Sequence, residues 1–162
     1  MGHPLDPATE IGPLINEEHY QKVTSYFDIA KKDGACIAAG GEKLGETGYF
    51  VKPTIFAEVP NESALAQEEI FGPVLSIITY VDINHAIEIA NDSIYGLSSY
   101  ITCLDTEDGV KIAKEIKAGQ TIINKKSRGS APAPFGGFKM SGNGREHGLY
   151  GLEEYLEIKA II

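Results

Sequence analysis

A glycine-rich segment is the part of this chain whose residue types point most clearly to chemistry. Residues 134–146 read Pro-Phe-Gly-Gly-Phe-Lys-Met-Ser-Gly-Asn-Gly-Arg-Glu, so four glycines stand among two aromatic and two cationic side chains. Glycine loses the most backbone freedom on folding, and a cluster of glycines therefore indicates positive φ angles or a close approach of backbone. A flexible connector would carry serine rather than Phe135, Phe138 and Arg145. We predict an ordered loop beside a ligand or an interface, in preference to a plain surface connector.

The cysteines and histidines show no pattern typical of catalysis or metal binding. Cys36 and Cys103 lack C-x-x-C spacing, and no cationic pattern around either thiol marks it as activated. We predict two free, buried packing thiols in a reducing compartment, in preference to a disulfide. The four histidines are scattered and none stands at metal-ligand spacing, so no metal site is expected.

Composition and charge limit the classes of partner. A length of 162 residues fits one domain, and 43% hydrophobic with 23% charged residues is typical of a soluble globular protein. The net charge of -9 argues against nucleic-acid and anionic-membrane partners, because both need clustered cations. No apolar run approaches the ~20 residues that span a bilayer, and no secretory signal is visible. A cytoplasmic protein is expected.

The elements that must position the glycine-rich segment indicate an α/β fold. A proline-rich arm over residues 4–13 precedes a helix that Asn16 caps and Gly34 ends. Short strands are expected at residues 35–39 and around 49–51, with glycine turns between them.

The centre of the chain alternates strands with helices. An almost continuous apolar run at residues 74–81 predicts a strand buried on both faces. A helix capped by Asp82 or Asn84 follows it. A strand at 98–103, a helix opened by Asp105 and Thr106, and a strand at 120–124 complete the series. This order predicts right-handed crossovers and a parallel open sheet with flanking helices.

The topology also predicts a place for the site. Ligands of open α/β sheets bind beyond the carboxyl ends of the strands. Residues 125–134 and the glycine-rich segment are therefore expected at that edge.

The last residues have the period of a strand. After a short helical stretch at 148–154, apolar residues alternate along 156–162, which is typical of a strand with one buried face. Because an unpaired apolar edge promotes aggregation, this strand is expected to pair with a neighbouring subunit or with the chain's own sheet. Periodicity leaves the two alternatives open.

Three segments, in the same order along the chain, resemble NAD(P)-dependent aldehyde dehydrogenases. They are Asp-Pro-Ala-Thr-Glu-Ile-Gly-Pro-Leu-Ile at 6–15, Gln-Glu-Glu-Ile-Phe-Gly-Pro-Val at 67–74, and the glycine-rich segment continued to Gly148. The resemblance covers essentially the whole chain and is to the C-terminal portion of these enzymes. It implies part of their catalytic domain over residues 1–154 and an oligomerisation strand over 155–162.

The resemblance implies roles for individual residues. Glu69 matches the glutamate that accepts hydrogen bonds from the hydroxyls of the nicotinamide ribose, and Phe71 matches the aromatic residue beside that ribose. Phe135 matches an aromatic wall of the substrate funnel. The variable segment that sets aldehyde preference matches residues 125–134, which include Arg128 and Gly129. Without the resemblance, Glu69 would be an acid at a helix end and Phe71 a core residue.

The funnel segment is unusually basic. Lys125, Lys126 and Arg128 supply three cations within four residues. These would suit an aldehyde with a distal carboxylate, since arginine pairs well with planar anions. The competing interpretation is a solvated basic loop.

The chemistry of these enzymes needs residues that have no match here. A cysteine thiolate attacks the aldehyde, hydride passes to the nicotinamide, and a glutamate-activated water hydrolyses the thioester. Neither Cys36 nor Cys103 fits the nucleophile, so no catalytic residue is assigned to this chain. The base glutamate and the main cofactor domain also lack a match. Gly142-x-Gly144 is not a dinucleotide fingerprint, because no predicted strand precedes it.

Two functions remain open. In the first, the chain is a truncated or split part of an aldehyde dehydrogenase that oxidises an aldehyde to a carboxylic acid with NAD or NADP. It would work as a homo-oligomer or with a missing N-terminal part, and alone it would be inactive and bind neither cofactor tightly. In the second, it is a non-catalytic remnant that acts as an interaction module. The intact Glu69 and Phe71 favour the first.

Overall fold

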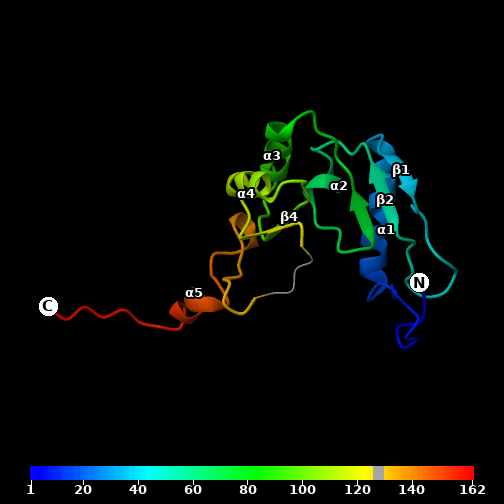
Figure 1. The fold of residues 1–162 in the computed structure, drawn as a ribbon. Coiled ribbons are helices and arrows are strands. Elements are labelled where there is room, and N and C mark those ends of the chain that lie inside the picture. Colours follow the sequence, from blue (N-terminus) through cyan, green and yellow to red (C-terminus); the bar gives the residue numbers. More distant parts are fainter. Residues whose placement is uncertain (126–129) are drawn as a thin grey trace. The chain divides into compact units, whose positions relative to one another are not determined.

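The computed structural model of this chain describes residues 1–125 and 130–162 (Figure 1). The chain divides into two compact units, Met1–Tyr80 and Val81–Ile162. Each unit holds a small sheet with a parallel strand pair and flanking helices. The predicted α/β class is confirmed.

The first unit folds a three-stranded sheet against one long helix. Its elements are α1 (Glu17–Lys32), β1 (Cys36–Ala39), β2 (Thr54–Ala57), α2 (Ala64–Gln67) and β3 (Val74–Ser76). Strand β2 lies in the middle, antiparallel to β1 and parallel to β3, with Ile55 opposite Leu75. Asn16 caps α1 as predicted, since its Oδ1 accepts from the amide of His19 at 2.8 Å. The arm before α1 holds turns only.

The core of the first unit lies between α1 and the segments that follow it. Its buried apolar residues are Val23, Tyr26, Phe27, Ala30, Val51, Phe56, Val59, Leu65 and Ile70. The rings of Phe27 and Phe56 meet edge to face, with centroids 6.1 Å apart. This packing fixes α1 relative to the chain that runs from β2 through α2 to β3.

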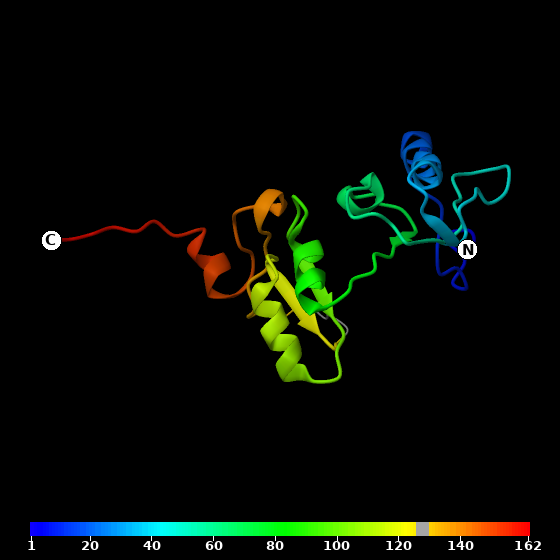
Figure 2. The same ribbon diagram turned by 90° about the horizontal axis from the view of Figure 1, so that it is seen from above.

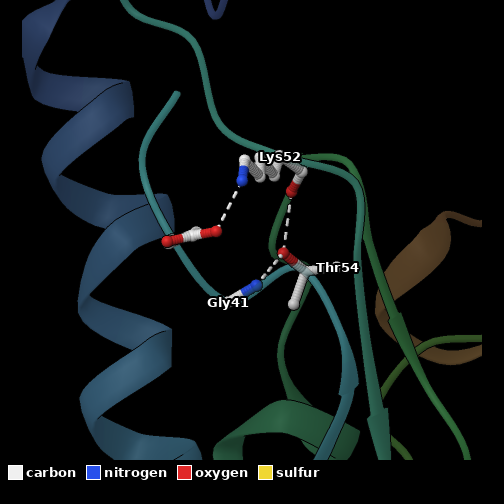
Figure 3. Close-up of polar contacts among 4 residues, drawn as sticks. Gly41, Lys52 and Thr54 are labelled. Atoms are coloured by element: carbon white, nitrogen blue, oxygen red, sulfur yellow. Dashed lines mark hydrogen bonds and ion pairs between the residues drawn. The ribbon is translucent and has the colours of Figure 1, made fainter. Parts of the chain in front are cut away.

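A polar network holds the β1–β2 connection against the start of β2. The Thr54 hydroxyl donates to the carbonyl of Lys52 at 2.7 Å and accepts from the amide of Gly41 at 2.9 Å (Figure 3). The Lys52 ammonium pairs with the Glu42 carboxylate. Thr54 is buried, so these bonds satisfy a hydroxyl that would be costly to leave unpaired.

The strand expected at residues 49–51 lies a few residues later. Val51 makes only an isolated bridge with Lys43, whereas regular pairing begins at Thr54. Side chains alternate in burial along Thr54–Ala57, with Thr54 and Phe56 buried. The four-residue strand is too short for its alternation to stand out in the sequence.

The second unit contains a βαβ crossover. Its elements are α3 (Ile83–Asn91), β4 (Ser98–Ile101), α4 (Thr106–Glu115), β5 (Gln120–Ile123), the 3₁₀ helix η1 (Lys139–Ser141) and α5 (Gly148–Glu153). Strands β4 and β5 are parallel, and α4 connects them and lies beside β5 (Figure 2). Asp82 caps α3, which settles the choice between Asp82 and Asn84, and Asp105 caps α4.

The predicted parallel pairing is present in each unit. Strand β3 pairs in parallel with β2 in the first unit, and β4 pairs in parallel with β5 in the second. The apolar run at 74–81, however, leaves the strand conformation after Ser76, and Leu75, Ile77 and Val81 are exposed rather than buried. An apolar run indicates a surface that favours burial, but it identifies neither the pairing partner nor what covers it.

Close packing in the second unit centres on glycines. Among its described residues the buried ones are all glycines: Gly96, Gly109, Gly137 and Gly151. Large apolar side chains such as Tyr100, Leu104 and Val110 are exposed. This unit therefore lacks, in its described part, the side-chain core that the first unit has.

The C-terminal residues carry no regular structure. The helical stretch at 148–154 is confirmed as α5, but residues 156–162 form neither helix nor strand (red in Figure 1) and are exposed. The alternative in which this segment joins the chain's own sheet is therefore wrong. Pairing with a neighbouring subunit stays a prediction. Among the described helices, none combines the length and the apolar character that crossing a membrane requires.

Candidate functional site

Glu69 and Phe71 lie on the short connection between α2 and β3. Glu68 ends α2 with extended backbone angles, and Ile70 inserts into the core. Phe71 has a left-handed backbone, with φ of 54°, and its side chain is 71% exposed. Burying Ile70 leaves the side chains of Glu69 and Phe71 exposed on either side of it. Phe71 is thus not the core residue that its type alone would suggest.

Helix α1 contacts this connection at three points. The Tyr26 hydroxyl donates to Glu68 Oε2 at 2.7 Å, and Lys22 Nζ donates to the carbonyl of Glu69 at 3.3 Å. Gly72 packs on Val23 so closely that an added Cβ would lie 2.8 Å from a Val23 methyl group. These contacts link residues far apart in sequence, so local periodicity did not reveal them. The spacing of Lys22 and Tyr26, four residues apart, indicates only that the two side chains share one face of a helix.

The arrangement suits a sugar attached to a flat ring. An exposed carboxylate can accept hydrogen bonds from two neighbouring hydroxyls, and an exposed aromatic face can pack against the sugar or its base. The chemistry of the two side chains therefore fits the nicotinamide ribose role that the sequence resemblance implies. That role stays a prediction.

The glycine-rich segment is an ordered loop. Its ends are joined by two main-chain hydrogen bonds, between Phe135 and Glu146, each 2.7 Å long. The Arg145 guanidinium donates to the carbonyls of Gly137 at 2.9 Å and Gly144 at 2.8 Å, and it lies 5.5 Å from the Phe138 ring centroid. The order of the predicted loop is confirmed, and its place beside a ligand or an interface stays a prediction.

The glycines allow backbone segments to touch. A Cβ on Gly119 would overlap the carbonyl oxygen of Gly136, and a Cβ on Gly137 would overlap the carbonyl of Ser141. A cleft of about 360 Å³ lies at this loop, and its lining includes the half-buried Phe135. The absence of side chains at these glycines is what permits the loop to pack.

The position of this loop differs from the prediction. The amide of Phe138 donates to the carbonyl of Gly96 at 2.8 Å, and Gly136 packs on Gly119. Gly96 lies two residues before β4 and Gly119 one residue before β5, so the loop lies at the amino ends of these strands and not at their carboxyl ends. The carboxyl-end rule locates ligands in an open sheet, and it does not dictate where a segment beyond the last strand returns to pack.

The carboxyl ends of β4 and β5 are joined by Asn124. Its Oδ1 accepts from the amide of Cys103 at 2.9 Å, and its backbone has φ of 53°. The Cys103 thiol donates to the carbonyl of Asp105 at 3.1 Å and is partly buried. Cys36, by contrast, is exposed, so the expectation of two buried thiols is wrong for it. Strand β1 is an edge strand with every residue exposed, which explains the difference.

Part of the predicted funnel cannot be placed. Arg128 and Gly129, with Lys126, lie outside the described residues, and Lys125 is exposed at the end of the described segment. Within residues 1–125 and 130–162, no group of acids, histidines and cysteines gathers as metal ligands would. Glu69 and Phe71 belong to the first unit, and Phe135 belongs to the second. The two predicted ribose contacts thus lie in one unit and the predicted funnel residue in the other.

Comparisons with known proteins agree with one another. A profile described as the aldehyde dehydrogenase family matches residues 1–161. A protein of Staphylococcus aureus (strain USA300), provisionally named an aldehyde dehydrogenase, is 47% identical over an alignment 165 residues long, which covers 99% of this chain and 34% of the relative. The Bacillus cereus aldehyde dehydrogenase in its NAD⁺ complex is 42% identical with a TM-score of 0.89, over 96% of this chain and 32% of the other. The Mycobacterium tuberculosis aldehyde dehydrogenase complexed with NAD⁺ is 44% identical with a TM-score of 0.89, over 95% and 32%. The chain spans about a third of the length of these relatives.

Proposed function

The chain belongs to the aldehyde dehydrogenase family, and from this membership we propose that it forms the C-terminal portion of an enzyme that oxidises an aldehyde to a carboxylic acid with NAD or NADP. The observation that carries the proposal is the pair of exposed side chains, Glu69 and Phe71, on a connection fixed by α1. Relatives at 42% and 44% identity have been seen with NAD⁺ bound, which supports this cofactor.

In this proposal, the residues of the first unit hold the nicotinamide ribose. The Glu69 carboxylate accepts hydrogen bonds from the two ribose hydroxyls and so orients the sugar. Phe71 packs beside the same sugar and shields it from water. The bound cofactor supplies the hydride acceptor.

The second unit contributes the substrate funnel. Phe135, held by its main-chain pairing with Glu146, forms part of the wall. We propose that residues 125–134, including Arg128 and Gly129, set the preference among aldehydes. The three cations Lys125, Lys126 and Arg128, which follow β5 in the sequence, would favour an aldehyde that carries a second, anionic group.

The chain needs further protein to act. Parallel strands are normally covered on both faces, and a two-stranded sheet is marginal alone. The described part of the second unit buries only glycines and exposes large apolar side chains, which favours a partner that covers them. We propose that the remaining length of the enzyme supplies this cover together with the cysteine nucleophile and the base glutamate. Residues 155–162 would then pair subunits, as an element separate from residues 1–154.

The alternative function, a non-catalytic interaction module, is favoured by one observation. Apolar residues of the tail, among them Leu156, Ile158 and Ile161, are exposed. Such a surface can bind protein without any cofactor. Cofactor binding at Glu69 distinguishes the two functions.

The test is a titration of the isotope-labelled chain with millimolar NAD, followed by NMR. We expect the amides of Glu69, Ile70 and Phe71 to shift and the affinity to fall about tenfold in Glu69→Gln, because one charged acceptor is lost. Glu62→Gln, an exposed acid in the same unit, is the matched control. If no amide near Glu69 responds, the module interpretation gains and the ribose contact is contradicted.

An activity assay completes the test. The chain alone, mixed with NAD and short aldehydes, should produce no NADH absorbance, because the nucleophile and base have no match in it. Turnover by the isolated chain would contradict that assignment.

A further inference from the structure

The connection that presents Glu69 is held from one face of α1, and Tyr26 makes the shortest of these contacts. We propose that Tyr26 is a positioning residue for the ribose-binding carboxylate: it holds the Glu68 side chain against α1 so that the Glu69 side chain is presented away from α1 in a fixed orientation. This inference rests on the proposed function, since it deepens the role given to Glu69.

The backbone of this connection needs support. Phe71 adopts a left-handed conformation, with φ of 54°, that is unfavourable for a bulky side chain. Such a conformation persists only where the surrounding structure determines it. Contacts on both sides of Phe71 must therefore hold the segment.

Tyr26 supplies the contact on the N-terminal side. Its side chain is buried, at 3% exposure, and its hydroxyl lies 2.7 Å from Glu68 Oε2. A hydrogen bond to a carboxylate is shorter and stronger than one between neutral groups. Glu68 has extended backbone angles, φ −115° and ψ 149°, so consecutive side chains point to opposite sides. Holding the Glu68 side chain on α1 therefore directs the Glu69 side chain away from it.

Two further contacts of α1 complete the support. Lys22, one helical turn before Tyr26, donates to the Glu69 carbonyl at 3.3 Å and so engages the main chain. Val23 packs against Gly72 on the other side of Phe71. The segment is thus fixed before, at and after the residues that face the ribose.

A purely structural role of Tyr26 predicts something different. In that case, loss of the hydroxyl would lower the stability of the whole first unit and would leave the order of residues 69–71 unchanged. A positioning role predicts a local loss of order and a loss of affinity, with the core intact.

The experiment compares Tyr26→Phe with Tyr20→Phe. Tyr26→Phe keeps the packed ring and removes the hydroxyl. Tyr20 lies on the same helix but its ring contacts Tyr49, at 5.9 Å between centroids, so Tyr20→Phe is the matched control. The readouts are ¹⁵N order parameters of residues 69–71, those of β2, and the NAD dissociation constant from amide shifts.

For Tyr26→Phe we expect the order parameters of residues 69–71 to fall from about 0.85 towards 0.6 while those of β2 stay high. The NAD dissociation constant should rise about tenfold, as expected for one charge-assisted hydrogen bond. Tyr20→Phe should change neither quantity. Glu68→Gln keeps an oxygen that can accept from Tyr26 and should retain most of the order, whereas Glu68→Ala should match Tyr26→Phe.

The outcomes separate this inference from the function on which it rests. Unchanged order at residues 69–71 in Tyr26→Phe would overturn the positioning role. Additive effects of Tyr26→Phe and Glu68→Ala in the double variant would overturn it as well, because coupled partners are non-additive. An absence of NAD-induced shifts in the unmodified chain would contradict the ribose contact, and the order parameters would still decide whether Tyr26 holds the segment.

Discussion

Phe135 and Glu146 exchange both of their main-chain hydrogen bonds, each amide nitrogen lying 2.7 Å from the other residue's carbonyl oxygen. The pairing closes the glycine-rich segment into a loop. The position of the Phe135 side chain, at the start of the loop, therefore depends on residues at its end. Arg145 is next to this closure and donates to two carbonyls within the loop.

We expect Arg145→Lys to loosen this closure. Lysine presents one ammonium where arginine presents a planar fork, so it cannot keep both carbonyl contacts and the contact with the Phe138 ring. The opening free energy of the loop should fall by about 1–2 kcal/mol. Hydrogen exchange of the Phe135 and Glu146 amides measures it. Lys111→Gln, which removes an exposed ion pair on α4, should change the opening free energy at these two amides by less than about 0.5 kcal/mol. An equal change in opening free energy in both variants would contradict the role of Arg145.

We expect Gly119→Ala to destabilise the contact between the loop and β5. The new Cβ would overlap the carbonyl of Gly136, and backbone on both sides would have to move. The opening free energy at the β5 amides should fall by about 1–3 kcal/mol, and hydrogen exchange of these amides measures it. Gly144→Ala is the matched control, because its Cβ would meet nothing closer than 3.7 Å. Equal stabilities of the two variants would show that Gly119 and Gly136 are not in contact.

We expect Asn124→Ala to lower the free energy of unfolding more than Asn124→Gly does. Both variants lose the acceptor for the Cys103 amide, but only alanine must also adopt the left-handed backbone that Asn124 has, φ of 53°. The free energy of unfolding of the glycine variant should exceed that of the alanine variant by about 1 kcal/mol. Thermal unfolding followed by circular dichroism, together with exchange at the ends of β4 and β5, tests it. If alanine proves the better tolerated of the two, the left-handed assignment at residue 124 is wrong.

We expect deletion of the last residues to shift the assembly towards monomer. Residues 157–162 hold no helix or strand, so their removal should leave the circular dichroism spectrum unchanged. A deletion that begins at residue 155 would also remove the amides of Tyr155 and Leu156, which donate hydrogen bonds to carbonyls at the end of α5. That deletion could therefore disturb α5 as well as the tail. Light scattering gives the mass. An unchanged mass after either deletion would remove the pairing role of the tail.

Local features of this chain could be predicted from sequence because one or two neighbouring residues determine them. The caps Asn16, Asp82 and Asp105 each require only a side-chain oxygen within reach of an amide two or three residues later. Likewise, the glycine cluster at residues 134–146 predicted close backbone contacts or positive φ angles; Gly136 and Gly137 make such contacts, and Gly142 has a φ of 124°.

Long-range relationships were not predictable in this way. The pairing of β3 with β2 and the contact of Tyr26 with Glu68 join residues far apart in the chain, and no local pattern carries that information. The loop at residues 134–146 was expected at the wrong end of the strands for the same reason. The resemblance placed Glu69 and Phe71 among candidate residues, but only the fold revealed that Phe71 is exposed.

That the described residues of the second unit bury only glycines has a consequence for how this unit responds to heat and denaturant. Burial of apolar side chains is the main source of the heat-capacity change and of the steep dependence on denaturant. A unit with so little buried apolar side-chain surface should melt gradually, with a small denaturant slope, and should lose little stability on cooling. The first unit, with Phe56, Val23 and Val51 fully buried, should melt sharply. One melting temperature would then describe neither half of the chain.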